Sequence, residues 1–209
     1  MYIAIEGVIG VGKTTLARLL QPTFNAKLML EVFEENPFLA DFYGDRDRYA
    51  FQTQIFFLLS RYHQQRAVAK LLTPEQGVIS DYTFKKDALF AEINLEGDEL
   101  DTYHQVHNAL AEKIILPNLI VYLRASTDVL MQRIAHRDRP YERDMDRNYI
   151  DDLNQAYESF FSDGFNGPRL LVVETDHLNY IANNEDLKWV ENRIRQSLDI
   201  PPYQTELLI

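Results

Sequence analysis

Short apolar runs alternate along this chain with longer segments in which apolar residues recur at helical spacing. The runs are rich in Ile, Val and Leu and are bounded by turn residues, as is typical of buried strands. We expect strands at residues 2–5, 27–30, 78–81, 119–123 and 169–173. Strands of this kind alternating with helices predict an α/β fold, namely a five-stranded parallel sheet flanked by helices.

The helical pattern is strongest over residues 47–72, where apolar and aromatic side chains cover much of the expected helix surface. This distribution predicts one long helix that is buried on several sides. A loop and a short helix with Pro37 near its first turn are expected before it. Further helices are expected at residues 16–20, 86–95, 99–115, 127–135, 149–161 and 186–198. The 209 residues contain no repeat, low-complexity segment or linker, which predicts a single domain.

One stretch between the first strand and the first helix has a specific chemical meaning. Residues 7–15 read GVIGVGKTT and fit the phosphate-loop pattern G-x-x-x-x-G-K-[ST], in the strand–loop–helix context that the pattern needs. Glycines allow successive backbone N–H groups to point at an anion, and the helix N-terminus adds positive potential. The motif predicts an ATP site formed by Gly7, Val8, Ile9, Gly10, Val11, Gly12, Lys13, Thr14 and Thr15.

Acidic residues stand where three of the expected strands end. Glu6 precedes the phosphate loop, Glu31 follows the second strand, and Asp81 closes the third. Ligands of parallel sheets bind beyond the carboxyl ends of the strands, so these acids predict a catalytic edge. In that setting Lys13 would reach the β- and γ-phosphates, and the Thr14 hydroxyl would ligate Mg²⁺.

Composition narrows the class of partner. The net charge of −11 argues against a nucleic-acid backbone or an anionic membrane as the main partner. The chain lacks cysteine, which excludes disulfides and thiolate metal sites and fits the cytoplasm. No apolar run is long enough to span a bilayer, and a first strand that starts at residue 2 leaves no room for a signal peptide. We expect a cytoplasmic enzyme with small-molecule substrates.

Two other classes of phosphate-loop protein, switch GTPases and motor or transport ATPases, are weighed against the sequence motifs that each class needs. A switch GTPase needs an N-K-x-D stretch, which is absent, and the D-x-x-G match at residues 41–44 lies in a helix-entry loop. An ATPase of the motor or transport type usually has a larger chain and an apolar strand that ends in Asp. Residues 78–81 match such a strand, so this alternative stays open.

An arginine-rich stretch favours a small kinase. Arg133 and Arg137 are four residues apart and share a helix face, and Arg139 lies just beyond them. Three guanidinium groups at one place repel each other unless an anion binds there, and a transferring phosphoryl group is such an anion. The stretch predicts a mobile lid at about residues 136–147. The structural alternative is a solvated basic face balanced by Asp138, Glu142 and Asp144.

In the order and spacing of these motifs, the chain resembles the deoxynucleoside kinases, in particular the bacterial deoxyadenosine/deoxyguanosine kinase branch. The resemblance covers nearly the whole chain. Its markers are the phosphate loop, Glu31 with EENPF at residues 34–38, FQTQ at 51–54 with SR at 60–61, SDYT at 80–83 with Asp87 and FA at 90–91, and the arginine lid with Glu142. It implies an ATP- and Mg²⁺-dependent kinase that phosphorylates the 5′-hydroxyl of deoxyadenosine or deoxyguanosine in nucleotide salvage, and a homodimer built on a helix pair.

The resemblance also implies roles for single residues near the reacting atoms. Glu31 would accept the proton of the substrate 5′-hydroxyl, and Asp81 would lie near Mg²⁺. The family usually has an arginine directly after this aspartate, close to the transferred phosphate, whereas this chain has Tyr82. Either a lid arginine takes over, or turnover is weaker, or the geometry of the site differs.

For the nucleoside itself, the resemblance implies a base pocket and a sugar pocket. Gln54 and Arg61 are two helical turns apart on one helix and would face the base together with Asp87. Tyr43 and Glu142 would bind the sugar 3′-hydroxyl, and Tyr43 would exclude a ribose 2′-hydroxyl.

Two alternatives to a deoxynucleoside kinase are kept. One is an enzyme like thymidylate kinase, which shares the phosphate loop and an acid after the third strand. The other is a regulator that binds ATP without transferring phosphate.

Overall fold

A computed structural model describes residues 1–162 and 164–201, apart from the side chain of Glu34. Its centre is a single sheet with strand order β2-β3-β1-β4-β5. Every strand pairing in this sheet is parallel. The strands are β1 (Tyr2–Glu6), β2 (Ala26–Met29), β3 (Gly77–Ser80), β4 (Leu119–Arg124) and β5 (Arg169–Glu174). The predicted five-stranded parallel α/β fold is therefore confirmed.

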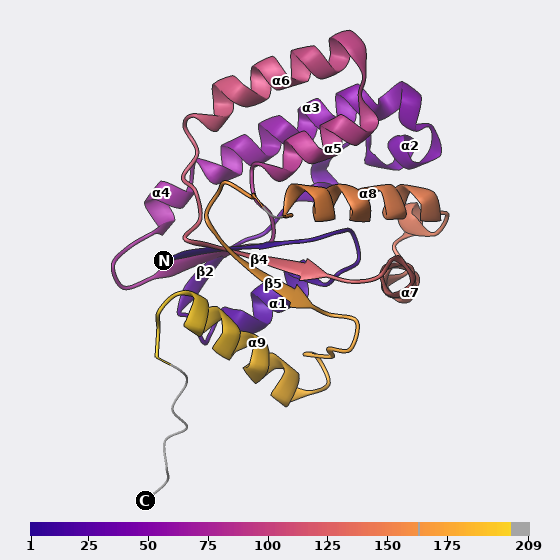
Figure 1. Ribbon diagram of the computed structural model, residues 1–209. Helices are drawn as coiled ribbons and strands as arrows, with labels where there is room; N and C mark the ends of the chain where they lie inside the picture. The colour runs from indigo at the N-terminus through magenta and orange to yellow at the C-terminus, as the bar shows by residue number, and fades with distance from the viewer. Residues whose placement is uncertain (163, 202–209) are drawn as a thin grey trace, which may run out of the picture.

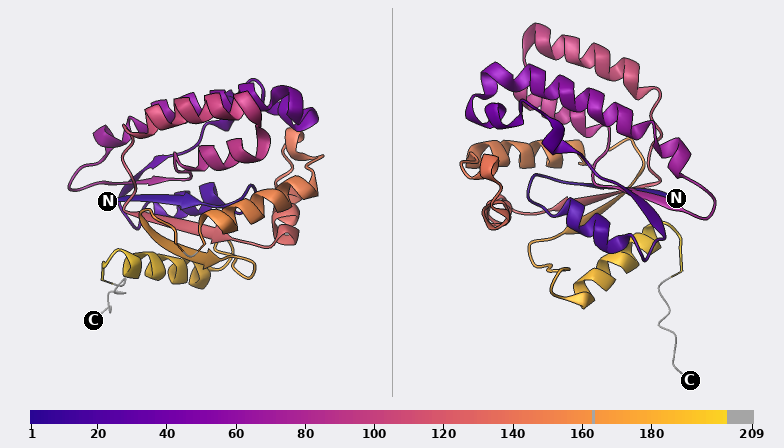
Figure 2. Two further views of the ribbon diagram at one scale, coloured as in Figure 1. Left: turned by 45° about the horizontal axis from the view of Figure 1, so that its top comes forward. Right: turned by 180° about the vertical axis from the view of Figure 1, so that it is seen from behind.

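Helices cover both faces of this sheet. On one face lie α1 (Lys13–Leu20) and α9 (Asn184–Ser197), as Figure 1 shows below the strands. The opposite face carries a deeper layer, in which α5 and α8 lie nearer to the sheet and α3 and α6 lie outermost (Figures 1 and 2). The bounds of these four helices are α3 (Arg46–Gln65), α5 (Lys86–Asn94), α6 (Gly97–Ala111) and α8 (Arg147–Phe160). Other helices at the periphery are α2 (Leu39–Gly44), α4 (Val68–Leu71) and α7 (Thr127–Arg137).

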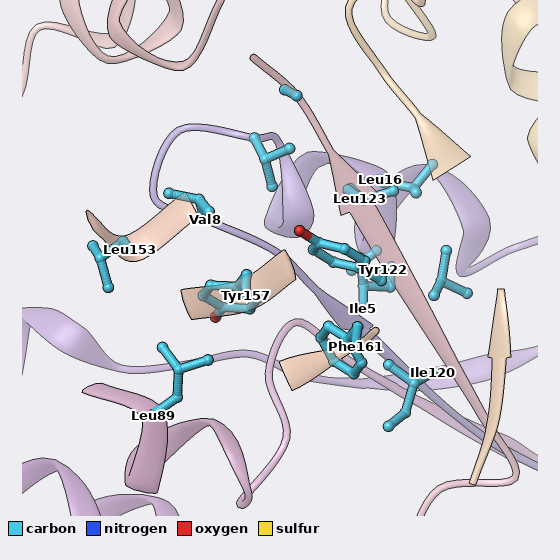
Figure 3. Packing of buried hydrophobic residues seen from close by; sticks show 14 of the residues in the cluster. Ile5, Val8, Leu16, Leu89, Ile120, Tyr122, Leu123, Leu153, Tyr157 and Phe161 are labelled. Carbon is cyan, nitrogen blue, oxygen red and sulfur yellow. The ribbon is translucent and has the colours of Figure 1, made fainter. Parts of the chain in front are cut away.

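The core lies on both sides of the central strands. Leu16 of α1 and Leu89 of α5 approach the sheet from its two sides (Figure 3). Aromatic side chains fill the α8 side, where the Tyr122 and Tyr157 rings stack with their centroids 5.9 Å apart. Burial on both faces explains why the central strands β3, β1 and β4 are apolar runs rather than alternating apolar and polar ones.

The prediction of one helix over residues 47–72 is wrong. The structure has two helices there, because α3 ends at Gln65 and α4 begins at Val68. After the turn, the side chain of Val68 is fully buried in a second apolar cluster with Tyr2 and Val78. No proline or glycine marks the break, so the packing of α4 on the sheet ends the long helix.

The helix predicted at residues 99–115 is displaced toward the N-terminus, since α6 runs from Gly97 to Ala111. The segment after α6 leads to the start of β1, where Asn118 N donates to the Tyr2 carbonyl at 2.8 Å. Tyr2 N donates in return to Asn118 Oδ1 at 2.7 Å. These bonds require a non-helical approach to β4. None of the helices in the described ranges has the length and apolar character needed to cross a bilayer.

Candidate active site

The phosphate loop joins β1 to α1 and encloses the Lys13 ammonium. Lys13 Nζ donates to the carbonyl oxygens of Gly7 at 2.7 Å and Val8 at 3.0 Å. Gly12 precedes the helix with φ 102°, a left-handed conformation, and a Cβ there would lie 2.4 Å from Tyr180 Oη. Burial, with repulsion from Lys86, lowers the pKa of Lys13 to about 8. An anion bound in the loop would favour the charged form again.

The outer side of the loop is held by Arg133. Its guanidinium group donates to the Val11 carbonyl at 3.3 Å and to the Thr175 hydroxyl and carbonyl at 3.0 and 2.6 Å. Tyr180 Oη also donates to the Val11 carbonyl, at 3.3 Å. Arg133 therefore ties the phosphate loop to the segment after β5, and it does not line the cleft with the other two predicted arginines. Its catalytic role stays a prediction.

Asp81 joins the phosphate loop to the end of β2. The Thr14 hydroxyl donates to Asp81 Oδ2 at 2.5 Å, and Glu31 N donates to Asp81 Oδ1 at 2.8 Å. A hydroxyl and a carboxylate suit Mg²⁺, which usually takes few protein ligands and completes its shell with water and nucleotide phosphates. The chain fits such a shared site. Within the described residues, no group of three or more His, Cys, Asp or Glu side chains could hold a metal.

Glu6, the third acid of the predicted catalytic edge, has a structural role. Its side chain is buried and accepts hydrogen bonds from Thr83 N at 2.5 Å and from the Tyr157 hydroxyl at 3.1 Å. The bond to Thr83 fixes the segment that leads into α5. That helix carries two charged residues of the site, Lys86 and Asp87, in its first turn.

The Glu31 carboxylate lies between two cations. Arg61 Nε donates to Glu31 Oε1 at 2.7 Å, and Arg61 Nη2 contacts the same oxygen. Lys86 Nζ donates to Glu31 Oε2 at 3.2 Å. Burial alone would raise the pKa of Glu31, but Arg61 and Lys86 outweigh it and hold this pKa well below its usual value. The carboxylate is thus ionised at neutral pH and able to accept a hydrogen bond or a proton.

A cleft extends from the phosphate loop past Glu31 and encloses about 800 Å³ together with its open mouth. Apolar and aromatic side chains form nearly half of its lining, and polar or charged groups form most of the rest. The apolar and aromatic lining consists of Ile9, Phe33, Leu39, Phe42, Tyr43, Phe57, Phe90, Tyr141 and Tyr149. A cleft with these walls and a few convergent polar groups is the usual form of a small-molecule site.

At the inner wall, the structure brings together the three residues predicted to face a base. Gln54 and Arg61 of α3 both line the cleft and are buried. Arg61 Nη1 forms an ion pair with Asp87 Oδ1, and Asp87 is only 1% exposed. Asp87 Oδ2 has no hydrogen-bond partner in the part of the chain that the structure describes. The wall therefore offers an amide and a guanidinium group, while the buried Asp87 carboxylate pairs with Arg61 and does not line the cleft itself. Its contact with a base stays a prediction.

The arginine-rich stretch forms a closed arrangement over the cleft. Asp138, with φ 49°, ends α7 and turns the chain, so that Arg137 and Arg139 approach one acid. Arg137 Nη2 lies 2.5 Å from Glu142 Oε2, and Arg139 Nη1 lies 3.5 Å from Glu142 Oε1. Glu142 is 4% exposed and belongs to a single turn of 3₁₀ helix, Pro140–Glu142. The predicted mobility of residues 136–147 stays a prediction.

Tyr43 stands beside this lid. Its ring stacks on Tyr141, with the centroids 6.1 Å apart and the planes 7° from parallel. Tyr43 and Glu142 line the same cleft, as they must if both are to contact one sugar hydroxyl. Tyr43 and Tyr141 therefore connect α2 to the lid, and the sugar contact itself stays a prediction.

The sequence analysis missed Lys86 and several aromatic residues that line the cleft, among them Phe33 and Tyr141. Lys86 directly precedes Asp87 in the sequence, so its place in the first turn of α5 was the available signal. Tyr82, which replaces the arginine typical of the resembling family, does not line the cleft. Its side chain is fully buried, and its hydroxyl donates to Gln64 Oε1 at 2.7 Å.

Comparisons with known proteins agree with this geometry. A family model described as deoxynucleoside kinase matches residues 3–199. The deoxyguanosine kinase of Bacillus subtilis (strain 168) is 34% identical over 199 residues, which cover 93% of this chain and 96% of that protein. The deoxyadenosine kinase of Dictyostelium discoideum is 36% identical over 78% of this chain and 67% of its own length.

Solved structures give the same answer for the fold. Deoxyadenosine kinase from M. mycoides, with the products dCMP and dCDP bound, superposes with a TM-score of 0.82 at 27% identity, covering 94% of this chain and 100% of that one. A second structure of that enzyme, with dATP bound, gives a TM-score of 0.80 at 27% identity over 93% of this chain and 99% of that chain.

Proposed function

Because the chain belongs to the deoxynucleoside kinase family, and is therefore a phosphotransferase that acts on nucleoside and nucleotide substrates, we propose that it transfers the γ-phosphate of ATP to the 5′-hydroxyl of deoxyadenosine or deoxyguanosine. The observation that carries this proposal is the place of the Glu31 carboxylate. It lies in one cleft between the phosphate loop and the polar wall of Gln54 and Arg61, and Arg61 pairs in turn with the buried Asp87.

The proposed reaction uses groups whose positions are known. ATP would lie with its phosphates in the loop at Lys13, and Thr14 and Asp81 would hold Mg²⁺ on them. Bound Mg²⁺ would neutralise charge on the phosphates. Glu31 would orient the 5′-hydroxyl and take its proton, while Arg137 and Arg139 would face the phosphates from the lid.

Product analysis tests the reaction class. Two reactions are run with ATP as the donor, one with a mixture of deoxynucleosides and one with thymidine monophosphate. The products of each reaction are separated by chromatography. We expect nucleoside monophosphates and an equal amount of ADP from the deoxynucleosides. Thymidine diphosphate as the main product would assign the chain to the thymidylate kinase class instead, and no transfer to any acceptor would favour an ATP-binding regulator.

For base selection, the proposal gives Asp87 the role of accepting a hydrogen bond from an exocyclic amine. Thymine has no such amine and carries a methyl group that needs space. Thymidine should therefore be the poorest acceptor among deoxyadenosine, deoxyguanosine, deoxycytidine and thymidine. Asp87→Ala should lower discrimination between a purine deoxynucleoside and thymidine by about 1–3 kcal/mol, the scale of one unsatisfied buried partner. Ratios of kcat/KM for the two acceptors measure this change.

The matched control is Asp101→Ala, an exposed position on α6. Because Asp87 also pairs with Arg61, the isosteric Asp87→Asn is measured beside it. The proposed base pocket is wrong if Asp87→Ala leaves the ranking and rates of all four acceptors as they are in the Asp101 variant.

We also propose a homodimer that works in the cytoplasm, where ATP and deoxynucleosides are available. The outward side of α3 supports the dimer, since Leu59 is 43% exposed and Phe56 is half-buried outside the main apolar cluster. Apolar side chains of this kind on one outer helix are a feature of two-fold interfaces.

Light scattering at micromolar protein tests the dimer. We expect twice the chain mass for the wild type and a lower mass for Leu59→Glu. Ile181→Glu is the control, because Ile181 is also exposed, at 75%, and lies between β5 and α9. A wild-type monomer at this concentration would contradict the proposed assembly.

A further inference from the structure

Lys86 is a buried cation whose donors are only partly used. It belongs to the first turn of α5 and is 6% exposed. Within the described part of the chain, its one hydrogen-bond acceptor is Glu31 Oε2, at 3.2 Å. An ammonium group has three donors, so Lys86 has capacity for further acceptors in the cleft. Its ammonium group lies over the Phe90 ring, whose centroid is 5.3 Å from Nζ.

The other cations near Glu31 are more fully engaged. Arg61 divides its guanidinium group between Glu31 and Asp87. Lys13 donates to two carbonyl oxygens of the phosphate loop. Position 82, next to Asp81, brings no charge to the cleft, because the Tyr82 side chain is buried in the apolar cluster with Tyr2. Among the described cations at this end of the cleft, Lys86 is thus the one with a single acceptor.

Lys86 and Lys13 also act on each other. Burial is the main cause of the lowered pKa of Lys13, and repulsion from Lys86 is the next. Two ammonium groups that repel each other across one cleft are stabilised when an anion binds between them. The cleft they share runs between the phosphate loop, which would hold ATP, and Glu31, which would hold the acceptor hydroxyl.

We infer that Lys86 is a catalytic residue, which donates hydrogen bonds to the non-bridging oxygens of the phosphoryl group as it passes from ATP to the acceptor. This inference rests on the proposed function. In the step, the bond between the acceptor 5′-oxygen and the γ-phosphorus forms while the bond to the β–γ bridging oxygen breaks. ADP leaves with that electron pair, and the hydroxyl proton goes to Glu31. Lys86 balances negative charge on the phosphoryl oxygens and exchanges no proton.

The test compares two neighbouring lysines. Lys86→Met and Lys85→Met are assayed with Mg-ATP and deoxyadenosine or deoxyguanosine, and kcat and KM are measured for each. Lys85 is half-buried and lies outside the cleft, so it is the matched control. We expect Lys86→Met to lower kcat about 10²-fold with little change in the nucleoside KM, and Lys85→Met to match the wild type. Lys86→Arg, which keeps a cation, should retain more activity than Lys86→Gln.

A second comparison separates contact with the phosphoryl group from an effect through Glu31. In a Glu31→Gln background, adding Lys86→Met should lower kcat by a further factor of about 10 or more. No further loss there, or equal kcat for Lys86→Met and Lys85→Met, would overturn the inference. If thermal melting shows that Lys86→Met is unfolded, equal rates for Lys86→Gln and Lys86→Arg would overturn it as well. A wild type that forms no nucleoside monophosphate would instead refute the proposed function.

Discussion

Replacement of Lys13 by alanine is expected to lower phosphoryl transfer by more than about 10³-fold while the protein remains folded. The Lys13 ammonium lies inside the phosphate loop, where it would meet charge that develops on the β- and γ-phosphates. Its surroundings lower its pKa to about 8, below the usual value for lysine, which means that the fold disfavours the charged form. Removing this charge therefore costs the folded state little, and the loss falls on catalysis.

Two measurements on Lys13→Ala check this expectation. Steady-state turnover with ATP and a purine deoxynucleoside gives the catalytic loss, and far-ultraviolet circular dichroism with a thermal melt reports the fold. Lys27→Ala is the control, since Lys27 is exposed on β2. A Lys13→Ala protein with near wild-type turnover would refute the assignment of the phosphate loop as the ATP site.

Replacement of Glu31 by glutamine is expected to lower kcat by about 10²-fold or more and to change the nucleoside KM much less. Glutamine keeps the size of the side chain but cannot take the proton of the 5′-hydroxyl. Arg61 and Lys86 keep the pKa of Glu31 low, so the carboxylate is ionised over the whole neutral range. The loss should therefore be similar from mildly acidic to mildly basic pH.

Exposed Glu35 lies four residues further along the chain, and Glu35→Gln is the matched control for this measurement. Single-turnover rates separate the chemical step from product release. Unchanged turnover in Glu31→Gln would move the role of the base to Asp81, which accepts a hydrogen bond from the Glu31 backbone at 2.8 Å.

Features that depend on local pattern were readable from the sequence. The central strands β3, β1 and β4 are buried on both faces and so appear as apolar runs, and the phosphate loop lies between β1 and α1 as its motif requires. The family assignment followed from the order of the motifs, and the family match over residues 3–199 confirms it. The roles of single residues in the site stay predictions.

Features that depend on tertiary contacts were not readable in the same way. The break between α3 and α4 has no proline or glycine, and it exists because Val68 packs on the sheet. Helical spacing placed Arg133 with Arg137, but the left-handed Asp138 turns Arg137 and Arg139 toward Glu142. Arg133, one turn earlier, meets Val11 and Thr175 instead. Lys86 was missed because only the packing of α5 on α3 brings it to Glu31.

The most direct test of the central claim is a ranking of acceptors by kcat/KM with ATP as donor. Deoxyadenosine, deoxyguanosine, deoxycytidine and thymidine are compared as single substrates, and thymidine monophosphate is added as a fifth. We expect one of the two purine deoxynucleosides to rank first and thymidine to rank last among the four. A wild-type protein that prefers thymidine or thymidine monophosphate would contradict the proposed function.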